Sequence, residues 1–326
     1  MNRRDLITLV GGAAVWPVAA RAQQVAMPVI VLVSARSPDD DARYGSAFRM
    51  GLAATGFIAG RTVTVEYHWL DGQYGDLPAL MDDLVRRRVA VIGTPGSATA
   101  ALAAKASTKT IPIVFGVGDD PVKLGLVESL ARPAGNVTGY NNFGNEVVGK
   151  RLAFLHELVP NAVRVAVLVN PTNATSTAQR DVPEVARALG LQIQVLNAST
   201  GPEIEAAFAT LVRQRADALF VAPDAFFSSQ RAQLAALSAR YAIPMTRSNP
   251  EDIEMIGGLM SYGTDFVDVY RQVGVYIGRV LNGENPADMP VEQSTKFALV
   301  INLKTARTLG ITVPPNLLAV ADEVIE

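Results

Sequence analysis

Cysteine is absent from the 326 residues, and histidine occurs only twice. Without a thiol the chain forms no disulfide, offers no cysteine nucleophile and builds no zinc site of the thiolate type. A chain of this kind must obtain its stability from its own core. Hydrophobic residues make up 49% of the sequence, which together with the length is enough to build one.

The sequence also lacks side chains at the spacings that are typical of catalytic or metal-binding sites. His68 and His156 fall in a strand-like and a helix-like segment, and neither follows a strand end. No His-x-x-x-His pair, metal-spaced carboxylate cluster or Gly-x-Ser-x-Gly elbow occurs. Asp119 and Asp120 are adjacent carboxylates, but neighbours in sequence usually point apart, which disfavours an acid–base pair. The sequence therefore predicts no enzymatic activity, no metal site and no cofactor.

Strong charge of one sign is also missing. The formal net charge is −2, and no basic patch or long run of like charge occurs. Because a nucleic-acid surface needs clustered lysine and arginine, we expect no nucleic-acid partner. The length exceeds the usual size of a single core, which predicts two lobes.

The N-terminus has the features of an export signal. Arg3 and Arg4 precede an apolar, small-residue stretch at 6–20, and the pattern small-x-small ends at Ala22. This predicts a signal peptide at 1–22 that is cleaved before Gln23. The arginine pair favours the twin-arginine route, with ordinary export as the alternative. An uncleaved membrane anchor is disfavoured because the apolar run is short and is interrupted by two glycines and a proline.

After the leader, strand-like runs alternate with segments of helical spacing. In the first half these runs lie at 29–33, 63–67, 89–92 and 111–115. The same order returns in the second half at 163–169, 192–195, 218–221 and 243–245. Repeated β-α-β units predict an α/β fold with doubly wound parallel sheets. The duplication predicts two such lobes, joined by a hinge and facing each other across a cleft.

Candidate ligand-binding residues lie at the carboxyl ends of the strands, where open parallel sheets bind their ligands. Ser34 ends the first strand. Thr94 and Ser97 lie where the third strand gives way to a helix, and the free backbone N–H groups of a helix start suit a carboxylate. The alternative role for Ser97 is simple capping of that helix.

Two carboxylates complete this set. Asp119 follows the fourth strand, where it either contacts the ligand or caps the turn near Val122. Asp224 follows the second-half equivalent of the third strand, so pseudo-symmetry places it opposite Thr94. A carboxylate in that position suits the ammonium group of an amino acid.

An ordered series of short motifs covers nearly all of the mature chain. The series comprises Gly96-Ser97, IPIVF at 111–115, DPV at 120–122, GLVESLA at 125–131, GNVTG at 135–139, MPVE at 289–292 and NLKTA at 302–306. In these motifs the chain resembles the ABC transporter substrate-binding family that includes tryptophan- and tyrosine-type uptake proteins.

The resemblance implies a type I periplasmic-binding-protein-like fold, with two lobes joined by three crossovers. By that analogy lobe 1 comprises 28–139 plus 258–288, and lobe 2 comprises 140–257 plus 289–326. Asn141 and Tyr262 then lie at or near crossovers, where they either contact the ligand from the hinge side or pack the hinge.

The resemblance also implies a function. It predicts a monomeric periplasmic protein that binds a small solute, an amino acid or related carboxylate with an apolar or aromatic side chain, and delivers it to ABC permease subunits. The leader has no lipobox cysteine, so we expect free diffusion in the periplasm. Two other functions remain open, namely a ligand-sensing pair of lobes in a signalling system and a secreted α/β enzyme. The enzyme is disfavoured by the missing nucleophile, base and metal sets.

Export makes the first testable prediction. The mature protein should begin at Gln23, and replacing Arg3 and Arg4 by lysines should leave precursor in the cytoplasm, because the twin-arginine route requires the pair. N-terminal sequencing of periplasmic protein checks the cleavage site, and a periplasmic chain that begins at Met1 contradicts it. Export that survives the double substitution contradicts the twin-arginine route alone.

Overall fold

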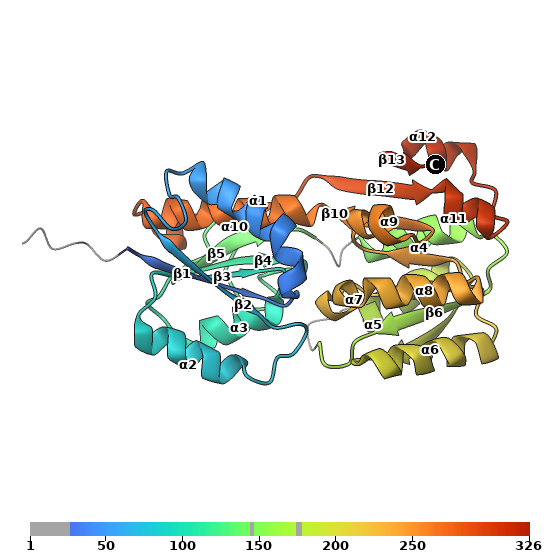
Figure 1. Cartoon of the computed structure of the whole chain (residues 1–326), viewed down its shortest axis with the longest axis horizontal. Helices are drawn as coiled ribbons and strands as arrows, with labels where there is room; N and C mark the ends of the chain where they lie inside the picture. The colour runs from blue at the N-terminus through green and yellow to red at the C-terminus, as the bar shows by residue number, and fades with distance from the viewer. Residues whose placement is uncertain (1–26, 144–146, 174–177) are drawn as a thin grey trace, which may run out of the picture.

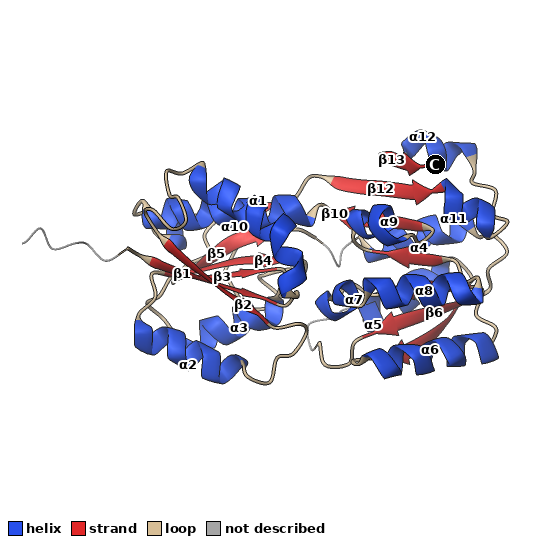
Figure 2. Ribbon diagram, viewed as in Figure 1, coloured by secondary structure: helices blue, strands red, loops and turns tan. Residues whose placement is uncertain are grey.

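The computed structural model describes residues 27–143, 147–173 and 178–326. They form two lobes, each with a central sheet and helices on both faces (Figures 1 and 2). This confirms the predicted α/β fold with two doubly wound lobes. The predicted signal peptide and its cleavage site lie outside the described residues. In the part of the chain that is described, no helix has both the length and the apolar character needed to cross a bilayer.

Lobe 1 contains a six-stranded sheet in the order β11-β5-β4-β3-β1-β2, and every neighbouring pair is parallel. Its central strands are apolar and buried on both faces, as expected for a parallel sheet between two helical layers. The strands are β1 (Val29–Ser34), β2 (Thr64–Trp69), β3 (Val91–Pro95), β4 (Ile113–Val117), β5 (Val137–Asn141) and β11 (Glu292–Gln293).

Four helices cover the two faces of this sheet. One apolar cluster joins the sheet to α2 and α3, and a second joins the opposite face to α1 and α10. Two 3-10 turns complete the lobe. The helical segments are α1 (Asp41–Ala53), α2 (Leu77–Arg87), α3 (Ala98–Ser107), α10 (Phe266–Leu281), η1 (Pro38–Asp40) and η2 (Pro286–Asp288).

Lobe 2 contains a seven-stranded sheet in the order β13-β12-β10-β9-β8-β6-β7. Its order 7-6-8-9-10 repeats the order 2-1-3-4-5 of lobe 1, which is the duplication that the sequence predicts. Only the β10–β12 pair is antiparallel. The strands are β6 (Arg164–Val169), β7 (Gln192–Asn197), β8 (Ala218–Val221), β9 (Met245–Arg247), β10 (Met260–Thr264), β12 (Phe297–Asn302) and β13 (Glu323–Ile325).

The helices of lobe 2 again form two layers. One apolar cluster packs α4 and α5 on the sheet, and the other packs α6 and α8 on the opposite face. Shorter helices lie at the ends of the strands. The helices are α4 (Val148–Leu158), α5 (Ala178–Ala188), α6 (Gly201–Arg213), α7 (Ala225–Ser229), α8 (Arg231–Tyr241), α9 (Pro250–Ile256), α11 (Leu303–Thr308) and α12 (Pro315–Val320).

The chain crosses between the lobes three times, after β5, after β10 and after β11. The strand pairing places the lobe boundaries differently from the expected 28–139 plus 258–288 for lobe 1. β10 belongs to the sheet of lobe 2, whereas the end of β5 and all of β11 belong to the sheet of lobe 1. Strands that lead into a crossover stay paired until they leave their sheet, and sequence periodicity does not reveal that point. The first two crossovers are tied together, because the Thr264 hydroxyl donates to the Asn142 carbonyl at 2.5 Å.

Glycines allow α1 and α10 to pack backbone against backbone in lobe 1 (Figure 1). A Cβ on Gly51 would overlap the carbonyl of Arg271, and a Cβ on Gly274 would overlap the carbonyl of Phe48. Both glycines therefore face the partner helix at a distance that excludes any side chain. Since α10 enters lobe 1 from lobe 2, this contact fixes one end of the hinge to the body of lobe 1.

Replacing Gly274 by alanine tests this contact. Alanine in a helix interior normally stabilises by up to about 1 kcal/mol over glycine, but here the helices must separate, so we expect a net loss of about 1–3 kcal/mol in the free energy of unfolding. Urea denaturation measures the change. Gly75→Ala is the control, because a Cβ there meets no atom within 4 Å. Equal stability of the two variants would contradict the close packing.

Candidate functional site

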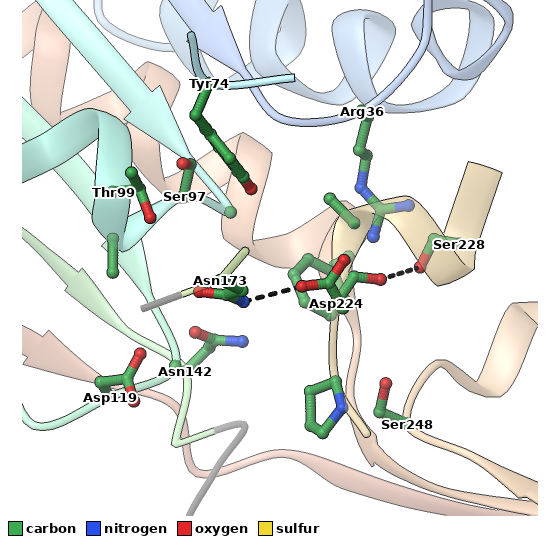
Figure 3. Close-up of a pocket in the computed structure, with 16 residues that line it drawn as sticks. Arg36, Tyr74, Ser97, Thr99, Asp119, Asn142, Asn173, Asp224, Ser228 and Ser248 are labelled. Atoms are coloured by element: carbon green, nitrogen blue, oxygen red, sulfur yellow. Dashed lines mark hydrogen bonds between the residues drawn. The ribbon is translucent and has the colours of Figure 1, made fainter. Parts of the chain in front are cut away.

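A cavity lies between the lobes at the carboxyl ends of both sheets. Lobe 1, the first crossover and lobe 2 all contribute to its wall (Figure 3). Its volume is about 90 Å³. A water molecule needs about 10–15 Å³ on this measure, so the cavity admits a small polar group such as the head group of an amino acid. It is lined by Arg36, Tyr74, Gly96, Ser97, Ala98, Thr99, Gly118, Asp119, Asn142, Asn173, Pro223, Asp224, Ala225, Ser228, Ser248 and Phe266.

The start of α3 forms one side of this cavity. Gly96 turns the chain with φ +75°, a conformation that favours glycine, and the first turn of the helix then faces the cavity. The Ser97 side chain accepts a hydrogen bond from the Ala100 N–H at 3.1 Å, so Ser97 caps the helix and lines the cavity as well. Thr99 adds a second hydroxyl from the same turn. The helix start thus presents hydroxyl and backbone N–H donors to the cavity.

Asp224 lies on the side that lobe 2 forms. Its carboxylate accepts hydrogen bonds from the Asn173 amide at 2.8 Å, the Asn170 amide at 3.2 Å and the Phe226 N–H at 2.8 Å, and the last of these caps α7. Burial raises the pKa of the Asp224 carboxyl, and the two amides and the backbone N–H groups act in the opposite direction. Figure 3 shows Asn173 pointing at Asp224, with Ser97, Thr99 and Tyr74 on the other side of the cavity.

Asp119 is the second carboxylate of the cavity, and it comes from the end of β4. Its neighbour Asp120 accepts the N–H groups of Val122 and Lys123 at 2.9 and 3.2 Å. The turn is therefore capped by Asp120, whereas Asp119 faces the cavity.

Four predicted residues lie outside the cavity wall. The Ser34 hydroxyl is bonded to the Tyr270 hydroxyl at 2.7 Å, and Thr94 is fully buried within β3. The Asn141 side chain accepts the N–H of Phe143 at 2.9 Å. Tyr262 belongs to the apolar cluster of lobe 2, where its ring contacts Phe154 and Phe297. These four residues stay predictions as ligand contacts, and none of them lines this cavity.

Several lining residues were missed by the sequence reasoning. Arg36, Asn142 and Asn173 each follow a strand by a few residues, so the strand-end rule finds them when it is extended past the last strand residue. Tyr74 and Phe266 follow no such rule, because they lie in the segment before α2 and at the start of α10. Burial raises the pKa of the Tyr74 hydroxyl, and the charge of Asp224 raises it further. Tyr74 therefore stays neutral across the cavity from that carboxylate.

The charges of the cavity suit a zwitterion. Among the described lining residues, the charged groups are the cation Arg36 and the carboxylates Asp119 and Asp224. The other polar groups are neutral hydroxyls and amides. In residues 27–143, 147–173 and 178–326, no cluster of three or more histidine, aspartate or glutamate side chains has a geometry that would hold a metal ion. The groups that line the cavity are suited to hydrogen bonds and to pairing with opposite charges.

Comparisons with known proteins show the family of the chain. The model of a family described as ABC transporter substrate binding protein matches residues 25–325. A tyrosine-binding protein from Clostridioides difficile (strain R20291) is 29% identical over 214 residues, which are 65% of this chain and 61% of that protein. The chain thus matches less than two thirds of that relative's length.

Solved structures cover more of the chain. An ABC domain from Streptococcus pneumonia in complex with L-Trp is 26% identical, covers 91% of this chain and 100% of its own, and superposes with a TM-score of 0.78. The ligand-free, open structure of a substrate-binding protein with adhesive properties from Clostridium difficile is 24% identical, covers 92% and 99%, and has a TM-score of 0.63.

The raised pKa of Asp224 predicts a pH-dependent effect on stability. A carboxyl whose pKa is higher in the folded than in the unfolded state destabilises the fold above its folded pKa, and this penalty fades as the pH falls towards the ordinary value of about 4. Asp224→Asn removes the penalty. Its free energy of unfolding, relative to the wild type, should therefore be highest near neutral pH and should decrease towards pH 4.

Urea denaturation of ligand-free protein at several pH values measures this difference. Asp82→Asn, an exposed carboxylate on α2, is the control for the loss of one charge. A difference between Asp224→Asn and the wild type that rises as the pH falls, or stays constant, would show that burial does not raise the pKa of Asp224.

Proposed function

The chain belongs to the ABC transporter substrate-binding protein family, and from this premise we propose that it binds an amino acid, or a closely related carboxylate, in the cleft between its lobes. The family consists of substrate-binding proteins and not of enzymes. The proposal is based on one observation, namely that hydrogen-bond donors line one side of the cavity and a carboxylate lines the other. Donors at the start of α3 face the carboxylate of Asp224 on the other lobe.

An α-amino acid matches both sides of this cavity. Its carboxylate would lie against the first turn of α3, where Ser97, Thr99 and backbone N–H groups converge. Its ammonium group would face Asp224, and Asp119 adds a second negative charge. Because these partners belong to different lobes, the ligand would join the lobes by its own two charges.

An aromatic side chain is the best-supported choice for the rest of the ligand. The related structure from Streptococcus pneumonia holds L-Trp, and the related protein from Clostridioides difficile carries the name tyrosine-binding protein. The cavity itself includes the rings of Tyr74 and Phe266, which provide apolar surface for such a side chain. The volume of 90 Å³ fits a head group, so a ring requires the lobes to separate slightly.

The second part of the proposal concerns delivery of the bound solute to a transporter. We propose that the exported chain closes on its ligand by hinge motion in the periplasm and that the closed form docks on ABC permease subunits. The arrangement of the lobes supports a closed form, since residues of both lobes line one cavity. The chain also superposes better on the tryptophan complex than on the ligand-free, open structure.

Isothermal titration calorimetry tests the binding site, with L-tryptophan, L-tyrosine and other amino acids as ligands. A hydrogen bond to a charged partner contributes about 1.5–3 kcal/mol, so Asp224→Ala should weaken binding by about tenfold to a few hundredfold. Ser97→Ala should also weaken binding. Asp82→Ala, on the exposed face of α2, should bind like the wild type.

A second control separates binding from folding. Thr200 caps α6 away from the cavity, so Thr200→Ala removes a helix cap without touching the cavity wall. Its loss of stability should match the loss caused by Ser97→Ala, at about 1 kcal/mol, with unchanged affinity. Unchanged affinity in both Asp224→Ala and Ser97→Ala would contradict the proposed site, and wild-type protein that binds no amino acid would contradict the proposed ligand class.

A further inference from the structure

Arg36 lies at the top of the cavity in Figure 3, with its side chain directed into the space between the lobes. The residue is only 5% exposed. Its guanidinium carbon lies 4.2 Å from the ring centre of Tyr44 on α1 and 4.7 Å from that of Phe266 on α10. A guanidinium that stacks on rings uses its faces for these contacts, so its N–H groups bond in its own plane. Planar carboxylates are the partners that such an edge binds best.

The ring beneath Arg36 is held by the other lobe. The Tyr44 hydroxyl donates a hydrogen bond to Glu251 Oε2 at 2.7 Å and accepts one from the Asn249 amide at 3.1 Å. Tyr44 belongs to α1 of lobe 1, whereas Glu251 and Asn249 lie at the start of α9 in lobe 2. These bonds form only while the lobes are close together.

Charge adds to this contact between lobes. Arg43 Nη2 lies 3.1 Å from Glu251 Oε1 across the same boundary. Burial raises the pKa of the Glu251 carboxyl, and the Tyr44 hydroxyl, Arg43 and Arg36 act in the opposite direction. The carboxylate of Glu251 is therefore within the electrostatic reach of Arg36, although it contacts Tyr44 directly.

From these contacts we infer that Arg36 recognises the carboxylate of the bound ligand, and that Glu251 of the opposite lobe is a positioning residue that fixes Arg36 through Tyr44 when the lobes close. The inference rests on the proposed function and deepens it. Figure 3 draws Arg36 on the side of Asp224, with Ser97 and Thr99 opposite, so the carboxylate would lie between Arg36 and the start of α3, and the ammonium group would lie against Asp224 of lobe 2. Closure then completes the carboxylate subsite through Glu251 and Asn249 of lobe 2, although neither of these residues lines the cavity.

The test compares ligands that differ only in the carboxylate. L-Tryptophan and tryptamine, with L-tyrosine and tyramine as a second pair, are titrated into the exported protein, and the ratio of their affinities is measured. In Arg36→Gln the preference for the amino acid over the amine should fall by about ten- to a hundredfold, the effect of one charge-assisted bond. Arg36→Lys keeps the charge but loses the planar edge, so it should recover only part of this preference.

Glu251 is tested by the same ratio. Glu251→Ala removes the acceptor for Tyr44 and should lower the preference several-fold, while Glu251→Gln keeps an acceptor oxygen and should retain most of it. Tyr44→Phe preserves the ring beneath Arg36 but loses the bonds to lobe 2, so it should resemble Glu251→Ala. A merely structural role would weaken both ligands of a pair equally and leave the ratio unchanged.

The outcomes separate the inference from the proposed function. If the wild type binds neither the amino acids nor the amines, the proposed function fails and the inference fails with it. If the wild type prefers the amino acids and Arg36→Gln and Arg36→Lys keep the full preference, the inference alone is overturned. If Arg36→Gln loses the preference but Glu251→Ala and Tyr44→Phe do not, the positioning role of Glu251 is overturned. Circular dichroism confirms that each variant is folded.

Discussion

The opposition of two largely parallel sheets is the constraint on which the rest of the structure depends. Right-handed β-α-β units direct the carboxyl ends of the parallel strands of a sheet towards one edge, and the loops that bind ligands gather at that edge. Here the two edges face each other, so residues as distant as Ser97 and Asp224 meet at one cavity. The bond between Thr264 and Asn142 ties two crossovers together beside that cavity. The hinge and the site are therefore built from the same short segments.

Periodicity in the sequence predicted both sheets and their duplication, and the strand-end rule and the family resemblance together named three residues that line the cavity and four that do not. Thr94 is the penultimate residue of β3 and is fully buried, while Ser97 lines the cavity. Asn141 ends β5, and the next residue, Asn142, lines the cavity. Since side chains alternate along a strand, such a shift moves a residue from the site into the core. Tyr262 lies within β10, so proximity to a crossover did not bring it to the cavity.

Other parts of the site depend on packing that no local pattern reports. Phe266 reaches the cavity because α10 returns to lobe 1 and packs against α1 through Gly51 and Gly274. Tyr74 reaches it from the segment between β2 and α2. The lobe boundaries shifted for a related reason, since strand pairing decides where a chain leaves its sheet. The duplication and the motif series predicted the binding class, but no local pattern predicts these tertiary contacts.

The bonds that Tyr44 and Arg43 make with Glu251 have a consequence for the equilibrium between open and closed states. They contribute to closure whether or not the cleft is filled, because none of these three residues lines the cavity. A ligand that binds the closed state has an apparent affinity equal to its intrinsic affinity multiplied by the closed fraction. Strengthening this contact would thus favour closure on any ligand, in addition to its effect on Arg36, and the same contact must be broken before the lobes can open and release a ligand. Glu251 would therefore influence the release of a ligand as much as its capture.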